Sequence, residues 1–316
     1  MNVLVIDILE QELILMSEKL FNTLLLDRTT QKNICWATEH YIENGDSYFP
    51  QEPITKNLIT GKNTDLIKPR VARSSTEQNL RTKENAEVFT PSWICNEQNN
   101  LIDEDWFGRK NVFNIASGHT WKVVEAPIEF PKNKTWKQYV DAKRLEISCG
   151  EAPYLVSRYD TVTGKEIPIK ERIGLLDRKL RVVNENINNE KEWFNWVQRA
   201  YEATYGYEYQ GDNLLIAREN MLYTFIENMN YKFGKKPTEN QLNIIARITS
   251  WNIWQMDGIT MTVPFAERPR INRQLSLFDL DNEGNIPSTE KIPCRIYDWR
   301  SKTSLEFRSI LDNEVR

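Results

Sequence analysis

The stretch from Leu145 to Leu155 constrains the fold of this chain most. Its sequence, Leu-Glu-Ile-Ser-Cys-Gly-Glu-Ala-Pro-Tyr-Leu, predicts a short apolar strand closed by an acidic residue, a tight turn on Gly150 and the start of a helix. Such a strand–turn–helix presents free backbone N–H groups and the positive end of a helix to a ligand. A single glycine is also common in plain connecting turns, so a ligand-binding turn and an ordinary loop both stay open here.

The composition is that of a folded chain large enough for one large domain or two modest ones, with 316 residues, 40% hydrophobic and 27% charged. The net charge of -4 does not indicate a nucleic-acid-binding protein, and the basic run at residues 165–181 is most simply a solvated face. Four widely spaced cysteines and two histidines argue against a metal site. No apolar run is long enough to span a membrane, so we expect a cytoplasmic protein with reduced thiols.

The first part of the chain differs in character from the rest. Residues 1–27 carry apolar side chains at helical spacing and predict a helix, and residues 33–38 predict a buried strand. Residues 41–85 contain several glycines and prolines and predict loops. We therefore expect residues 1–80 to form a helix-plus-loop extension and residues 81–316 to form the main domain.

Two further stretches predict elements that could shape a ligand site. Residues 86–94 predict a proline-containing turn that leads into an apolar helix, with Thr90 as its N-cap. Residues 205–220 predict a strand that ends near Glu208, followed by a helix. A carboxylate at the end of the second strand of a nucleotide-binding sheet can accept hydrogen bonds from both hydroxyls of a ribose.

The last informative stretches lie nearer the C-terminus. Residues 252–259 predict a strand that ends in Asp257, where a carboxylate is able to accept from the amino group of an adenine. Asp-Gly is equally typical of a turn, so this assignment has an alternative. Residues 292–299 predict one more strand.

Taken in order, these stretches resemble the amino-terminal half of adenine-specific DNA methyltransferases of restriction–modification systems, in particular the methylation subunits of restriction endonucleases. The likeness covers about residues 80–260, and Phe89-Thr90-Pro91 is its most specific motif. The resemblance implies an α/β fold with a Rossmann-like sheet and helices on both faces, shortened at the C-terminus. It also implies methyl transfer from S-adenosylmethionine to adenine N6 of DNA.

The resemblance implies a set of cofactor-binding residues: Phe89, Thr90, Pro91, Glu146, Ser148, Gly150, Glu151, Glu208, Tyr209 and Asp257. The Phe-Thr-Pro motif would pack against the methionine moiety and the adenosine. Glu208 would hold the ribose, Tyr209 would lie beside the adenine ring and Asp257 would take the adenine amino group. The other four residues would form the turn under the methionine end.

The chain departs from the family pattern in three places. The family's turn usually has two glycines, whereas Gly150 is followed by Glu151 and Ala152, and the long gap between Glu146 and Glu208 implies an insertion of helices. The family's catalytic tetrapeptide, Asn or Asp, two prolines and an aromatic residue, is absent after the last predicted cofactor residue.

Asp298-Trp299 is the nearest positional candidate for that missing tetrapeptide. An aspartate is able to accept a hydrogen bond from an amine, and a tryptophan is able to stack on a flipped base. We therefore take these two as the predicted catalytic residues.

Three functions stay open from the sequence. The ordered motifs favour the DNA adenine methyltransferase. The missing tetrapeptide and the short tail after Asp298 favour a catalytically degenerate, methyltransferase-like subunit that binds cofactor or DNA within a defence complex, with a second protein subunit that completes the site or supplies specificity. The third is a nucleotide-pocket fold whose ligand is a different molecule.

Overall fold

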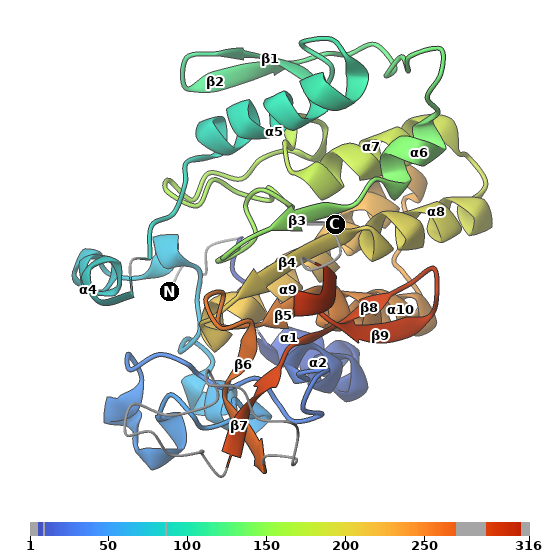
Figure 1. The fold of residues 1–316 in the computed structure, drawn as a ribbon. Coiled ribbons are helices and arrows are strands. Elements are labelled where there is room, and N and C mark those ends of the chain that lie inside the picture. Colours follow the sequence, from blue (N-terminus) through green and yellow to red (C-terminus); the bar gives the residue numbers. More distant parts are fainter. Residues whose placement is uncertain (1–5, 9, 86, 270–288, 311–316) are drawn as a thin grey trace, which may run out of the picture.

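The computed structural model describes residues 6–8, 10–85, 87–269 and 289–310, and its described part is mixed α/β with several small sheets (Figure 1). A three-stranded parallel sheet in the order β3-β4-β5 lies at its centre. Its strands are β3 (Arg144–Glu146), β4 (Thr204–Glu208) and β5 (Ile253–Gln255). Gly206 of β4 pairs with Glu146 on one side and with Ile253 on the other, so the three strands end close together.

Helices connect these strands and cover one face of the sheet. They are α7 (Leu175–Asn186) and α8 (Glu190–Glu202) between β3 and β4, and α9 (Gly211–Phe233) and α10 (Glu239–Asn252) between β4 and β5. The side chain of Asn189 caps α8, and Thr238 with Gln241 forms a capping box on α10. Both caps use the residue types that favour helix starts, so the sequence itself marks where these helices begin.

Hairpins cover the other face of the sheet. Tyr205 and Trp254 form a second apolar cluster there with residues of the C-terminal strands. These strands are β6 (Thr262–Pro269) paired with β7 (Thr289–Pro293), and β8 (Arg295–Asp298) paired with β9 (Thr303–Glu306). The expected larger Rossmann-like sheet with helices on both faces is not observed in the described residues. Strands β3, β4 and β5 lie side by side in their sequence order. Because connections between parallel strands are right-handed, both connections pass over the same face of the sheet, and their helices cover that face alone.

The N-terminal segment packs into the same core as the rest. Instead of one helix over residues 1–27, the described part holds α1 (Glu10–Met16) and α2 (Glu18–Leu25), separated at Ser17, whose side chain caps α2. Leu20 of α2 belongs to the same core cluster as Leu215 of α9. Helix α2 of the expected extension therefore shares an apolar core with the expected main domain.

Residues 33–38 form isolated bridges rather than the expected strand, one of them between Cys35 and Pro53. They nevertheless lie against the outer edge of β5. The Gln255 side chain donates to the Cys35 carbonyl at 2.9 Å and accepts the Cys35 N–H at 2.9 Å. The Gln255 amide thus makes both hydrogen bonds to the Cys35 backbone that a neighbouring strand would otherwise make.

The basic run at residues 165–181 is not a solvated face throughout. The buried Arg178 side chain forms an ion pair with Asp103 at 2.5 Å. The Lys179 ammonium is also buried and donates to the carbonyls of Ala142 and Ala203, which lie just before β3 and β4. Burial lowers the pKa of Lys179 well below its ordinary value. These two residues of the basic run are therefore internal contacts and not part of a solvated face.

The remaining elements are α3 (Lys56–Ile59), α4 (Ser75–Asn85), α5 (Ser92–Phe107), β1 (Asn114–Ser117), β2 (Thr120–Val123), α6 (Trp136–Asp141) and short 3-10 turns at Ile42–Asn44, Asp46–Tyr48, Gly61–Asn63, Arg70–Ala72 and Ile169–Glu171. Figure 1 shows the β1–β2 hairpin beside α5, and α4 on the side where the arrows of β3 and β4 end. No described helix combines the length and apolar character needed to cross a lipid bilayer.

Candidate ligand-binding site

A cavity of about 960 Å³ lies where the central strands end. Its lining includes Glu146 at the end of β3, Glu208 at the end of β4, and Asp257 just beyond β5. Ligands of open α/β sheets bind outside the carboxyl ends of the strands, and the volume is at the upper end of the usual range for ligand pockets. This cavity is therefore the candidate site.

The turn after β3 forms one wall of the cavity and has an unusual backbone. Ser148, Gly150 and Ala152 have φ angles of 47°, 52° and 64°. Left-handed conformations at non-glycine residues cost about 1–3 kcal/mol each and cluster at functional sites. The helix expected after Gly150 does not form, because Ala152 is left-handed and Pro153 follows it.

Glu208 joins this turn to the neighbouring strand. Its Oε2 accepts the N–H of Gly150 at 2.8 Å, and its Oε1 accepts the N–H of Gln210 at 3.1 Å. Burial raises the pKa of Glu208, and these N–H groups partly offset the rise. Since a carboxylate has about four lone pairs, Glu208 retains capacity to accept a further donor.

Glu146 has an oxygen without a partner. The N–H of Tyr154 donates to its Oε1 at 3.4 Å, whereas the buried Oε2 has no hydrogen-bond partner in the described part of the chain. Burial raises the pKa of Glu146 well above its ordinary value, and the charge of Glu208 adds to the rise. An unpartnered buried acceptor carries a free-energy penalty that a ligand donor removes. Glu146 is thus prepared for a donor such as an ammonium group.

Buried arginines hold the wall that carries Phe89. Glu87 accepts from Arg73 at 2.9 Å and from Arg81 at 2.7 Å. The two arginines also reach Asp212 in the first turn of α9, at 3.5 and 2.8 Å. Because all four charges are buried and paired, this network fixes the segment before Phe89 against α9.

The Phe89 ring lies directly over the glycine of the turn. A Cβ atom placed on Gly150 would lie 3.5 Å from Cε1 of Phe89. The Arg70 guanidinium lies over the same ring, 5.3 Å from its centre. Phe89 and Gly150 thus meet at the cavity, although they are far apart in the sequence.

Helix α5 begins differently from the prediction. Pro91 occupies the N-cap position without a side-chain cap, and Thr90 does not cap the helix. The N–H of Ser92 instead donates to Oδ2 of Asp160 at 2.8 Å. A distant carboxylate therefore caps α5 and leaves Thr90 to line the cavity.

The structure brings most of the predicted cofactor-binding residues to this one cavity: Phe89, Thr90, Glu146, Ser148, Gly150, Glu208, Tyr209 and Asp257. Pro91 and Glu151 do not line it. Glu151 is buried, and its two oxygens accept the N–H of Arg70 at 2.6 Å and the hydroxyl of Tyr159 at 2.7 Å. Glu151 therefore fastens the Arg70 segment to the turn.

Asp257 lies in a turn, the alternative that its Asp-Gly sequence left open. Its Oδ1 accepts the N–H groups of Ile259 at 2.9 Å and Thr260 at 3.2 Å. Burial acts to raise the pKa of Asp257, but these N–H groups bring it below its ordinary value. The residue is ionised at neutral pH at the rim of the cavity.

Asp298 and Trp299 do not line the cavity. Asp298 accepts the N–H of Arg300 at 3.0 Å and the hydroxyl of Ser301 at 2.9 Å, which stabilises the β8–β9 turn. The Trp299 indole donates to Asn252, the residue before β5, at 2.8 Å. Because Asn252 directly precedes β5, this bond places the predicted catalytic pair toward the amino end of β5, away from the cavity. Figure 1 shows the β8–β9 hairpin that carries the pair.

Several lining residues were not predicted from the sequence: Lys83, Glu84, Glu87, Cys149, Tyr154, Tyr207 and Asn213. Tyr207 directly precedes Glu208 in β4, so its place next to a strand end was a usable signal. Lys83 and Glu84 come from α4, and only the tertiary structure brings that helix to the strand ends. No local pattern marked them.

The lining of the cavity is rich in carboxylates. Glu84, Glu87, Glu146, Glu208 and Asp257 line it, and Lys83 is the cation among the described lining residues. Glu87 is neutralised by its buried arginines, but the balance is still negative. Such a cavity favours a ligand with positive charge and disfavours phosphate groups.

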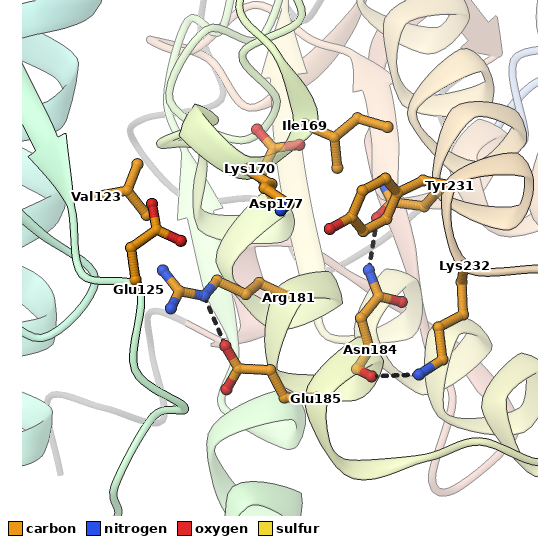
Figure 2. Close-up of a pocket in the computed structure, with 11 residues that line it drawn as sticks. Val123, Glu125, Ile169, Lys170, Asp177, Arg181, Asn184, Glu185, Tyr231 and Lys232 are labelled. Atoms are coloured by element: carbon orange, nitrogen blue, oxygen red, sulfur yellow. Dashed lines mark hydrogen bonds and ion pairs between the residues drawn. The ribbon is translucent and has the colours of Figure 1, made fainter.

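A smaller hollow of about 400 Å³ lies between α7, the turn at residues 169–171 and the end of α9, as Figure 2 shows. Its groups are largely paired: Arg181 with Glu185 at 2.7 Å, and Lys232 with the Asn184 carbonyl at 2.6 Å. Asp177 has one oxygen without a partner there. None of the predicted site residues lines this hollow, and we assign the candidate site to the larger cavity.

Comparison of the chain with protein-family models, with curated proteins and with solved structures finds no match. The residues that the structure describes include no cluster of three or more His, Cys, Asp or Glu that could hold a metal ion. All four cysteines are buried and unpaired. The assignment of function therefore depends on the geometry and charge of the cavity.

Proposed function

We propose that the cavity binds S-adenosylmethionine and that the chain is a methyltransferase acting on adenine N6 of DNA, within a restriction–modification or other defence system. In this proposal, the β3-β4-β5 sheet is the cofactor-binding part of a Rossmann-like sheet. The single observation that supports it most is the carboxylate-rich cavity at the strand ends, where the Gly150 turn meets Glu208.

The charge of the cavity suits this cofactor. S-adenosylmethionine carries a positive sulfonium, a positive ammonium group and one carboxylate, so its net charge is positive. Nucleoside phosphates and dinucleotides carry net negative charge at the same position in other α/β proteins. The unpartnered Oε2 of Glu146 is a suitable acceptor for the ammonium group. This difference in charge argues against a phosphate-bearing ligand for the same cavity.

The other residues have roles that follow from their contacts. Glu208 lines the cavity and retains acceptor capacity that the ribose hydroxyls would use. Tyr209, which is 39% exposed, and Phe89 provide aromatic surface for the adenine, and Asp257 offers a carboxylate for its amino group. When bound, the cofactor supplies an electrophilic methyl group, whose transfer to the amine releases a neutral thioether and a proton. The chain's part is to position the reactants.

A catalytically degenerate subunit is the second candidate, and one observation favours it. Asp298 and Trp299, the residues predicted to contact the target base, lie at the other end of the strands from the cavity. A chain that binds the cofactor or DNA and acts with a partner subunit needs no such pair.

Two measurements separate these candidates. Isothermal titration calorimetry of the full chain with S-adenosylmethionine tests the cavity, and transfer of a labelled methyl group to unmethylated DNA tests the reaction. Binding with transfer supports the methyltransferase, and binding without transfer supports the degenerate subunit. If the chain does not bind the cofactor, the proposal is wrong.

A further inference from the structure

Two arginines flank a row of three aromatic rings near the amino end of β5. Arg28 lies over the Trp251 ring at 5.9 Å, and Arg247 lies over the Trp299 ring at 5.9 Å. The Tyr297 ring lies between the two indoles, 5.3 Å from Trp251 and 4.6 Å from Trp299. We call these five residues the arginine–aromatic cluster. They come from the turn after α2, from α10 and from the β8–β9 hairpin.

Hydrogen bonds to neighbouring residues hold the cluster in place. The Arg28 Nε donates to the Ser250 hydroxyl at 2.8 Å. The Trp299 indole donates to Asn252 at 2.8 Å, and the Tyr297 hydroxyl donates to the carbonyl of Lys302 at 3.0 Å. The three rings are half-buried and Arg247 is exposed. The cluster is therefore a fixed surface that a partner can reach.

The positive charge of the cluster lacks a partner within the described residues. Neither Arg28 nor Arg247 lies within ion-pair distance of a described carboxylate, and burial together with the charge of Arg247 lowers the pKa of Arg28. The charge of the adjacent Asp27 partly offsets this lowering, although Asp27 forms no ion pair with Arg28 and its Oδ2 accepts the N–H and hydroxyl of Thr30. Asp298 is engaged in its own turn. An anion placed between the two guanidinium groups would relieve their repulsion.

We propose that the arginine–aromatic cluster binds the phosphate backbone of DNA, with Arg28 and Arg247 contacting phosphates and the aromatic rings lying against the sugars or bases. Arginine over an aromatic ring keeps its edge N–H groups for phosphate oxygens. Arginine is a common donor to DNA phosphates, and positively charged grooves with aromatic rings bind single-stranded nucleic acids. The identity of the nucleic acid as DNA rests on the proposed function.

This contact is separate from the cavity. The cluster lies by Trp251 and Asn252, at the amino end of β5, whereas the cavity lies at the carboxyl ends of the strands. The net charge of -4 does not oppose DNA binding at the cluster, because contacts to the DNA phosphate backbone depend on local charge. DNA bound at the cluster therefore makes a contact in addition to any made at the cavity.

Fluorescence anisotropy with a labelled DNA duplex, measured over a range of salt concentrations, tests this proposal. The Arg28→Ala/Arg247→Ala variant is expected to bind about 10- to 100-fold more weakly at about 0.1 M salt. The slope of log affinity against log salt should fall by about 2, roughly one for each lost phosphate contact. Lys235→Ala is the matched control, because this surface cation pairs with Glu190 elsewhere, and it should change affinity less than about two-fold.

Each outcome decides the proposal. Arg247→Lys keeps the positive charge and should retain the salt dependence of DNA affinity. If the double variant does not fold, Arg247→Ala alone tests the same contact, because Arg247 is exposed. Wild-type affinity and slope in both Ala variants would overturn the proposal. Titration with inorganic phosphate separates the two anion sources: arginine-dependent phosphate binding with unchanged DNA affinity would also overturn it. The double variant should bind S-adenosylmethionine as the wild type does. If the wild type itself does not bind S-adenosylmethionine, the proposed function is refuted, whereas the proposed anion contact is not.

Discussion

The carboxylate of Glu208 accepts the backbone N–H of Gly150 at 2.8 Å, although 58 residues separate the two in the chain. This bond ties the turn after β3 to the end of β4. It holds the left-handed Gly150 in place and directs the Glu208 carboxylate into the cavity. The geometry of the candidate site therefore depends on this pair.

Glu208→Ala is expected to weaken S-adenosylmethionine binding about 10- to 100-fold, because hydrogen bonds to a charged acceptor contribute about 1.5–3 kcal/mol. Calorimetric titration measures this loss. Glu306→Gln, an exposed position in β9, is the matched control and should bind normally. Unchanged affinity in Glu208→Ala would contradict the role of this carboxylate.

Glu146→Gln should flatten the pH dependence of stability. Burial raises the pKa of Glu146 above its ordinary value of 4.5, so the folded state holds this proton more tightly than the unfolded state. The associated stability is fully present below about pH 4.5 and is lost as pH rises through the folded pKa. Urea unfolding should show a lower free energy of unfolding at pH 8 than at pH 5 in the wild type, and a smaller difference in the variant.

The same variant has a second expected effect. The amide introduced by Glu146→Gln cannot release a proton to become a carboxylate when an ammonium group binds, so cofactor affinity should fall even where the protein is more stable. Glu306→Gln again serves as the control and should keep the wild-type pH dependence. Parallel stability curves for the wild type and Glu146→Gln would show that Glu146 does not titrate in this range.

Arg81→Ala is expected to destabilise the fold by about 3–5 kcal/mol, because removal of one member of a buried ion network leaves the others without their partner. Arg81 contacts both Glu87 and Asp212, and all three side chains are buried. Thermal unfolding measures the change, with Lys235→Ala as a surface control. A shift no larger than that of the control would mean that the network does not hold the Phe89 wall.

Asp298→Ala should leave cofactor affinity unchanged within about two-fold, because the residue lies away from the cavity. It should lower the free energy of unfolding by about 0.5–1.5 kcal/mol through loss of the hydrogen bonds to Arg300 and Ser301. Calorimetry and urea unfolding check the two effects. A large loss of cofactor affinity would contradict this prediction and would mean that Asp298 contributes to cofactor binding.

The sequence by itself determined the local elements. The strands that end at Glu146 and Glu208, the turn on Gly150 and helix α9 after Glu208 follow from apolar periodicity and turn residues, which act over a few neighbours in the chain. Because parallel strands that follow one another bring their carboxyl ends together, the strand-end residues Glu146, Glu208 and Asp257 also indicated part of the cavity lining.

Only the tertiary structure decided how distant segments meet. The β8–β9 hairpin turns Asp298 and Trp299 toward the amino end of β5, Asp160 caps α5, and Gln255 takes the place of a neighbouring strand beside Cys35. The paired arginines around Asp212 likewise join segments far apart in the chain. Such contacts depend on burial and charge pairing between remote residues. Local patterns fix what each segment forms, but the free energy of packing the segments together fixes which of them share a site.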